Sequence, residues 1–230
     1  MLYELWHCDV AAGKRPALLE RFESFTVRRW RELGIELLGC WTPVVAANHS
    51  QCLLLLRWHS FDERSRKLAA WQADAERAAV WARSESDGPL LERTHQQLLA
   101  ATAYSPRETG PALLPDAAGR PPYLFELRSY QAMPGRQQQV VDRFGSFVSA
   151  AFGRHGFHQL GYWTSLAGGH DHQLHYLLAW PSLDEREARF DAFLKDPQRV
   201  RFFAEQEKDG PIVQQASNAI LRPTAFSPLR

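Results

Sequence analysis

The sequence predicts an α+β fold in which two β-α-β-β-α-β repeats of one chain pack sheet to sheet. Three observations lead to this prediction. The chain matches itself without gaps at an offset of 122 residues, a Pro- and Gly-rich segment separates the two copies, and both copies alternate strand-like and helix-like stretches in the same order. Roughly a third of the paired residues are identical, against ~5–10% expected for unrelated segments of this composition. We therefore expect repeats at residues 1–106 and 123–230, joined by a linker at 107–122.

The internal match runs from Tyr3–Pro106 onto Phe125–Pro228, so even the loops keep their lengths. Short motifs recur at both places. They are Glu4-Leu5 and Glu126-Leu127, Gly39-x-Trp41 and Gly161-x-Trp163, Asp62-Glu63-Arg64 and Asp184-Glu185-Arg186, and Ser105-Pro106 and Ser227-Pro228. A repeat of this quality predicts that both halves have the same fold.

The second repeat shows its elements clearly. Tyr123–Tyr130 is rich in aromatic and branched residues and predicts a strand. Apolar residues then recur at helical spacing from Arg136 to His155, and Gly156 is placed to end that helix. A second helix is predicted to begin at Ser182, where Glu185 completes a capping box. The remaining strands are expected at Phe157–Thr164, Leu174–Trp180 and Ile212–Leu221.

The first repeat has the same order of elements. Its strands are expected at Leu2–Cys8, Ile35–Val45, Gln51–Trp58 and Leu91–Ala103, and its helices at Lys14–Leu33 and from Ser60 to about Ser86. This order is the ferredoxin-like unit, a four-stranded sheet with helices on one face. Because the other face needs cover, two such sheets can pack as an α/β barrel within one chain. Between them, Arg107–Pro122 predicts an extended linker.

Composition excludes several classes of protein. The chain has 27 Lys and Arg against 26 Asp and Glu, a net charge of +1, so we expect no general attraction to nucleic acid or membrane surfaces. No apolar run approaches the roughly 20 residues that span a bilayer, and we see no secretory signal. Cys8, Cys40 and Cys52 fit no Cys-x-x-Cys spacing, and we expect buried, reduced thiols in a cytoplasmic protein.

Motifs for nucleotide, serine-hydrolase or zinc-protease chemistry are absent from the sequence: there is no Gly-rich phosphate loop, no Gly-x-Ser-x-Gly and no His-Glu-x-x-His. The cluster His170-x-His172-x-x-His175 could supply metal ligands or one haem ligand. The alternative is a polar loop that enters a strand, and no acidic residue completes a known metal motif. We therefore predict no metal site and no bound cofactor.

The second repeat resembles the NIPSNAP family. The resemblance rests on Phe125-Glu126-Leu127-Arg128-Ser129-Tyr130, Arg154-His155-Gly156-Phe157, Gly161-Tyr162-Trp163, Ser182-Leu183-Asp184-Glu185-Arg186, Phe193-Leu194-Lys195-Asp196-Pro197 and Asp209-Gly210-Pro211. It implies a dimeric α/β-barrel fold. It leaves the chemistry open, because that superfamily includes cofactor-free monooxygenases, haem-binding proteins, isomerases and cyclases. The first repeat departs from the pattern, with Trp6, Cys8 and Leu54 in place of Arg128, Tyr130 and Tyr176.

Candidate site residues follow from side-chain alternation in the second repeat. Glu126, Arg128 and Tyr130 share one face of its first strand, and Tyr176 and Trp180 share a face of its third. We interpret Arg128, Tyr176 and Tyr130 as candidate catalytic residues that polarise an enol or carbonyl oxygen. The candidate substrate-binding residues are Glu126, Tyr162, Trp163, Trp180 and His158. The alternative is that Glu126 and Arg128 pair and serve packing alone, with Trp163 in the core.

The functional hypothesis is a barrel that binds a small hydrophobic or aromatic metabolite, with the pocket expected in the second repeat. As an enzyme it would be a cofactor-independent oxygenase, isomerase or cyclase. The alternatives are a haem-binding protein and a non-catalytic protein-interaction module, and the sequence decides neither catalysis nor homo-oligomerisation. Six of the eight tryptophans lie in the first repeat, which fits either a filled core or an aromatic cavity there.

Overall fold

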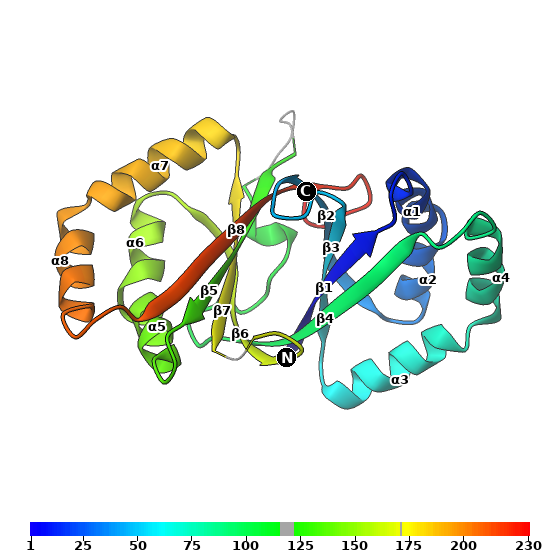
Figure 1. The fold of residues 1–230 in the computed structure, drawn as a ribbon, viewed down its shortest axis with the longest axis horizontal. Coiled ribbons are helices and arrows are strands. Elements are labelled where there is room, and N and C mark those ends of the chain that lie inside the picture. The colour runs from blue at the N-terminus through cyan, green and yellow to red at the C-terminus, as the bar shows by residue number, and fades with distance from the viewer. Residues whose placement is uncertain (116–121, 171) are drawn as a thin grey trace.

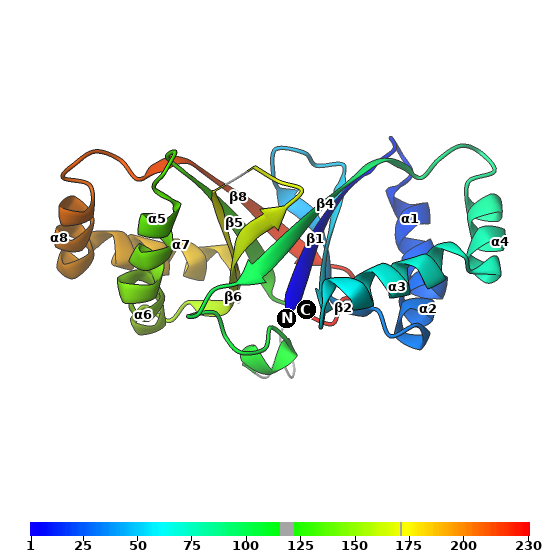
Figure 2. The same cartoon turned by 90° about the horizontal axis from the view of Figure 1, so that it is seen from below.

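A closed antiparallel barrel is the centre of the molecule. The computed structural model describes residues 1–115, 122–170 and 172–230, and within them eight strands form the barrel. The strands are β1 Leu2–Val10, β2 Glu36–Val45, β3 Gln51–Trp58, β4 Leu91–Ala101, β5 Leu124–Ala132, β6 His158–Ala167, β7 Gln173–Trp180 and β8 Val213–Pro223. The helices of the first repeat lie on one side of the barrel and those of the second repeat on the opposite side (Figures 1 and 2).

The strand order is β1-β3-β2-β8-β5-β7-β6-β4, so each repeat contributes four adjacent strands. The two sheets join where β2 pairs with β8, for example Trp41 opposite Pro223, and where β4 pairs with β6, for example Ala101 opposite Trp163. Closure leaves no strand of the barrel with an unpaired edge. The predicted fold class, two ferredoxin-like repeats that form an α/β barrel within one chain, is confirmed.

Each repeat carries one long interrupted helix and two shorter ones. They are α1 Arg15–Arg21, η1 Phe22–Thr26 and α2 Val27–Glu32, then α3 Phe61–Gln72 and α4 Ala75–Ser84; and α5 Gln137–Arg143, η3 Phe144–Val148 and α6 Ser149–Arg154, then α7 Leu183–Lys195 and α8 Pro197–Gln206. The segments η1 and η3 are π-helical turns inside helices that the sequence predicts as uninterrupted. In the described part of the chain, no helix has the length and apolar character needed to cross a membrane.

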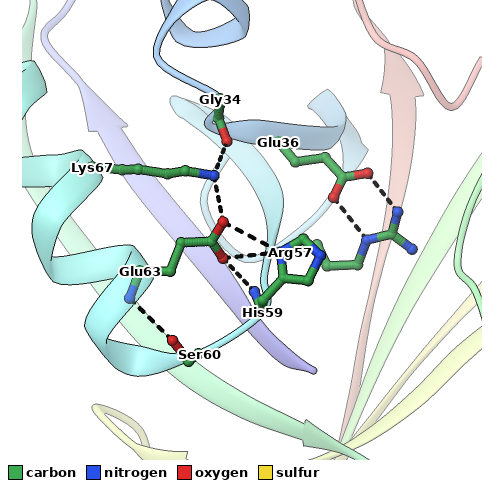
Figure 3. A network of polar contacts seen from close by, with 7 residues as sticks. All are labelled: Gly34, Glu36, Arg57, His59, Ser60, Glu63 and Lys67. Atoms are coloured by element: carbon green, nitrogen blue, oxygen red, sulfur yellow. Dashed lines mark hydrogen bonds and ion pairs between the residues drawn. The ribbon is translucent and has the colours of Figure 1, made fainter.

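A polar network fixes the start of α3 against the end of α2 (Figure 3). The Ser60 hydroxyl accepts a hydrogen bond from the Glu63 backbone N–H at 3.1 Å, which caps the helix as Ser182 caps α7. The Glu63 carboxylate in turn accepts from the His59 backbone and from Lys67, and the Lys67 ammonium also reaches the Gly34 carbonyl. Hydrogen bonding from Lys67 lowers the pKa of Glu63 to about 2, so this anchor is charged at neutral pH.

The described residues form three apolar clusters in the interior: one fills the barrel and one lies under each helix layer. Trp41 and Trp163 belong to the barrel cluster, and both are 1% exposed. A Cβ added at Gly39 or Gly161 would lie 2.1 Å from the indole of the tryptophan two residues later. The repeated Gly-x-Trp motif therefore exists because each indole lies directly over the glycine Cα.

The linker is less extended than the sequence predicts. Pro111–Leu113 forms a short 3₁₀ helix, and the Thr109 hydroxyl donates a hydrogen bond to the Leu160 carbonyl at 2.9 Å. Proline fits the first position of such a turn, because its missing N–H is not needed there. Residues 116–121 of the predicted linker lie outside the described residues.

The end of each repeat docks on the other repeat. The Ser105 hydroxyl accepts a hydrogen bond from the Tyr162 backbone N–H at 3.0 Å. At the equivalent positions, the Ser227 hydroxyl accepts from the Cys40 backbone N–H, also at 3.0 Å. This reciprocal exchange gives the repeated Ser-Pro motif a structural role: it ties each tail to the strand of the opposite repeat that lies at the seam between the two sheets.

Candidate functional site

Glu126 is the centre of a buried polar cluster in the second repeat. Its side chain is fully buried, and one carboxylate oxygen accepts hydrogen bonds from Arg128 at 2.8 Å, Arg186 at 2.7 Å and Asn218 at 3.0 Å. The other oxygen accepts from Trp180 Nε1 at 3.0 Å and from Arg186 Nε at 2.7 Å. Burial on its own would raise the pKa of Glu126, but the hydrogen bonds and charges of the two arginines outweigh it and lower that pKa.

The first repeat contains the same arrangement around Glu4. Its carboxylate is fully buried and accepts from Trp58 Nε1 at 3.0 Å and from both Arg64 Nε and Nη2, at 2.8 and 2.5 Å. Because Glu, Trp and Arg recur at equivalent positions, this trio serves the fold: it ties β1 to β3 and α3, and β5 to β7 and α7. Burying a carboxylate requires such pairing.

The three candidate catalytic residues lie together. Arg128 Nε donates to the Tyr176 hydroxyl at 2.7 Å, and its Nη2 donates to the Tyr130 hydroxyl at 3.3 Å. The guanidinium also lies 5.1 Å from the ring centre of Phe190 on α7. Burial raises the pKa of Tyr176 well above its usual range, so the phenol is neutral at physiological pH. The polar groups of this cluster are satisfied by one another.

The other predicted residues divide into two groups. Tyr162 stacks on Tyr176 with ring centres 5.5 Å apart, and Trp180 donates to Glu126, so both belong to this cluster. Trp163 does not: it fills the barrel interior against Tyr3. His158 also lies apart, at the start of β6, where burial and the neighbouring Arg189 lower its pKa. The structure therefore brings together six of the eight predicted residues, and Trp163 and His158 lie outside this group.

The space between sheet and helices in the second repeat is densely packed around Tyr176. Phe144 and Phe152 approach its ring to 5.1 and 6.1 Å between centres, and Phe152 stacks on Phe157 at 4.2 Å. Tyr176 itself is completely buried. Its face of the sheet is thus covered by aromatic side chains from η3 and α6.

A cavity of about 500 Å³ lies at the corresponding place in the first repeat, between β1 and β4 on one side and η1, α2, α3 and α4 on the other. Four tryptophans line it: Trp6 from β1, Trp30 from α2, Trp71 from α3 and Trp81 from α4. Successive indoles meet edge to face, with ring centres 5.7, 5.9 and 5.5 Å apart. We expected the pocket in the second repeat, but this aromatic cavity lies in the first.

The reason for this difference is the size of the sheet residues. Where the second repeat has the phenols of Tyr130, Tyr162 and Tyr176, the first has Cys8, Cys40 and Leu54 at the offset of 122. Cys8 lines the cavity. Since the Cys8 side chain is smaller than that of Tyr130, space remains at this point of the layer beneath the helices. The signal was present in the sequence as the excess of tryptophan and the loss of three tyrosines, but it did not say whether indoles would fill that space.

Among the described residues, the barrel interior offers no room for a ligand. The void bounded by Trp41, Trp163 and neighbouring leucines has a volume of only about 10 Å³, about the space that a single water molecule needs. The faces of the two sheets that meet inside the barrel are therefore a structural core.

The histidine cluster is dispersed. His175 is buried and contacts Ser129 through Nδ1 at 2.8 Å and Gln97 through Nε2 at 3.0 Å, while His172 lies on the exposed loop before β7. Burial lowers the pKa of His175 to about 4. Within the described ranges, no group of three or more His, Cys, Asp or Glu side chains could hold a metal ion. Both ring nitrogens of His175 are occupied by neighbours, so this residue is not presented to a haem iron.

The three cysteines are free and buried. Cys40 and Cys52 lie with their sulfur atoms 3.4 Å apart on neighbouring strands, and burial raises the pKa of Cys8 to about 12. A thiol with such a pKa is protonated at neutral pH and is a poor nucleophile. Cys8 therefore contributes shape, not reactivity, to the cavity.

The barrel and its two outer helix layers define a protein of the dimeric α/β-barrel class with both halves in one chain. A monooxygenase-like protein from Fusobacterium nucleatum has a TM-score of 0.63 at 9% sequence identity, over 96% of this chain and 91% of its own. An anthrone oxidase-like protein gives a TM-score of 0.56 at 14% identity, over 100% of this chain and 94% of its own. At these identities the similarity shows a shared fold.

The NIPSNAP family model matches residues 3–106 and 125–228. The chain therefore belongs to the NIPSNAP family and contains two tandem copies of its domain. A NIPSNAP family protein from Agrobacterium tumefaciens is 26% identical over 47% of this chain and 99% of its own, with a TM-score of 0.42. No curated protein gives a significant match.

Proposed function

We propose that this protein binds a small hydrophobic or aromatic molecule in the cavity of the first repeat. The observation that carries the proposal is the cavity itself, about 500 Å³ in volume and lined by four tryptophans. Ligand sites commonly have volumes of ~300–1,000 Å³ and mainly apolar and aromatic walls with a few polar groups. The duplicated fold supports this reading, because the second repeat packs the same place with side chains and so shows that the fold does not need the cavity.

As an enzyme, the protein would act on such a molecule without a bound cofactor, as an oxygenase, isomerase or cyclase. An oxygenation reaction is the activity after which the Fusobacterium relative is named. In this form of the proposal, the cavity excludes water and positions the substrate. The cluster of Arg128, Tyr130 and Tyr176 lies in the other repeat, so it does not touch a substrate in this cavity, and its catalytic role stays a separate prediction.

The test is calorimetric titration of the full chain with 2-acetylnaphthalene, a neutral bicyclic aromatic ketone. We expect saturable binding at one site. Replacing Cys8 by Tyr introduces the residue that the second repeat carries at the equivalent position, and it should weaken binding at least about tenfold by filling the cavity. Tyr130→Phe is the matched control, because it changes the same position in the other repeat, and it should leave affinity unchanged.

Two results would contradict the proposal. One is the absence of binding by both 2-acetylnaphthalene and a charged analogue of the same shape. The other is binding that Cys8→Tyr leaves intact while circular dichroism shows a folded protein, because the ligand would then occupy a different place. A crystal structure of the complex would show the ligand against Trp6 and Trp30 if the proposal is correct.

A further inference from the structure

Four polar side-chain atoms of residues that line the cavity are buried without a hydrogen-bond partner: Trp6 Nε1, Trp30 Nε1, Thr26 Oγ1 and Arg77 Nε. Trp30 and Thr26 are each only 2% exposed. The three nitrogen groups can only donate hydrogen bonds, and the hydroxyl can donate as well. Because buried polar groups almost always have partners in native proteins, it is notable that four residues lining the cavity carry buried donors that lack an acceptor.

The second repeat shows that the fold does not require three of these donors. Phe152 stands where the first repeat has Trp30, and Val148 stands where it has Thr26. Neither side chain has a polar atom. In place of Trp6, the second repeat has Arg128, whose donors are used by Glu126, Tyr130 and Tyr176. Three of the four unpartnered donors, those of Trp6, Trp30 and Thr26, thus have no unpartnered counterpart in the second repeat, whereas Arg77 Nε has one in Arg199 Nε.

The charged side chains that line the cavity are all basic. In the described part of the chain, the lining contains three arginines and no acidic residue. Arg21 is paired with Glu85 at 2.7 Å, and Arg64 is paired with Glu4 at 2.5 Å. Among the described residues, Arg77 has no carboxylate partner for its guanidinium. A positive charge therefore remains uncompensated at the wall of the cavity.

Arg77 is held by stacking. Its guanidinium lies 4.6 Å from the ring centre of Trp81 and 5.4 Å from that of Trp71. The equivalent Arg199 stacks in the same way on Phe203 and Phe193, so the stacking belongs to the fold of both repeats. What differs is the surroundings, because only Arg77 of the two lines the aromatic cavity. Arg199 is for this reason a matched control for Arg77.

We infer that the cavity takes a planar aromatic molecule that carries an oxyanion, such as a carboxylate or phenolate. The indoles match the flat apolar body, the unpartnered donors match the lone pairs of the oxygen atoms, and Arg77 matches the negative charge. This inference rests on the proposed function, since it names the chemical class of the ligand in that same cavity. Amines and metal cations are disfavoured there, because no lining side chain carries a negative charge to balance them.

The experiment compares 2-naphthoate with 2-acetylnaphthalene, which has nearly the same shape but no charge. Both are titrated into the full chain by calorimetry at pH 7 and at two salt concentrations. We expect 2-naphthoate to bind at least about tenfold more tightly, with a preference that declines as salt rises. Arg77→Gln should remove most of that preference without weakening 2-acetylnaphthalene, whereas Arg199→Gln should leave both affinities unchanged.

The donors are tested with the residues that the second repeat itself carries. Thr26→Val and Trp30→Phe are substitutions that this fold already accommodates, and each should weaken 2-naphthoate several-fold more than 2-acetylnaphthalene. Equal affinity for the two probes, or a preference that survives Arg77→Gln, would overturn the oxyanion inference and leave the aromatic site standing. Failure of both probes to bind would overturn the proposed function and this inference together.

Discussion

Replacing Arg128 by Leu separates a structural role from a catalytic one. The substitution removes the donors to Glu126, Tyr176 and Tyr130 while keeping an apolar stem of similar length. Glu126 would keep Arg186 and its other donors, so its charge would stay paired. The Tyr176 hydroxyl, in contrast, would lose the arginine that donates to it in the centre of a completely buried side chain.

The expected loss of stability follows from these contacts. A lost charge-assisted hydrogen bond to Glu126 costs about 1.5–3 kcal/mol, and an unsatisfied buried hydroxyl costs about 1–3 kcal/mol. Leucine recovers part of this through apolar packing, which leaves a net loss of about 3 kcal/mol. For a chain of this size, such a loss lowers the melting temperature by about 6–12 °C.

The assay is urea and thermal unfolding followed by circular dichroism, together with calorimetric titration of 2-acetylnaphthalene. Arg201→Leu is the control, because Arg201 is exposed in the same repeat. We expect Arg128→Leu to be less stable and to bind the probe as before, since the cavity lies in the other repeat. A variant that loses less than about 1 kcal/mol of stability but loses ligand binding or turnover would refute this reasoning and support a catalytic role for Arg128.

Three further predictions concern the scaffold. Gly161→Ala should lower the free energy of unfolding, measured in urea, by about 3 kcal/mol, because its Cβ would lie 2.1 Å from the Trp163 indole. The double variant Gly161→Ala with Trp163→Leu should recover part of that loss. His175 has a pKa of about 4 when folded but near 6.5 when unfolded, so stability should fall as pH drops from about 6.5 to 4, and His175→Gln should flatten that slope. Ser227→Ala should lower the free energy of unfolding by about 1 kcal/mol and speed hydrogen exchange of the Cys40 amide, which donates to the Ser227 hydroxyl. Unchanged exchange at Cys40 would contradict the docking of this tail.

The architecture was predictable because the same residues build the same element twice. Ser60 and Ser182 were both predicted to begin a helix, Ser182 through its capping box, and each accepts from the backbone N–H three residues later. The π-helical turns were not predictable, since one extra residue in a helical turn hardly changes the spacing of apolar positions. The position of each indole over its glycine was also not predictable, because it depends on contacts across the barrel.

Less of the candidate site than of the fold could be predicted from the sequence. Alternation along β5 placed Glu126, Arg128 and Tyr130 on one face, and the structure has them there. The sequence could not show that the donors of Arg128 are used by its own neighbours. A cavity is harder still, because it depends on space that no side chain fills. The sequence showed that Cys8 stands in the first repeat where the second has Tyr130. The effect of this difference depends on how closely the helices pack on the sheet, which the sequence did not show.

The exchange of tails between the repeats has a consequence for stoichiometry. In an assembly of two identical subunits, every substitution appears on both sides of the symmetry axis, and any binding site is present twice. Here the halves interlock through Ser105 and Ser227, yet each position is encoded separately, so Cys8 and Tyr130 can differ. If the proposed ligand occupies the tryptophan-lined cavity, we expect one site per chain and a simple hyperbolic isotherm, with the other repeat serving to complete the barrel.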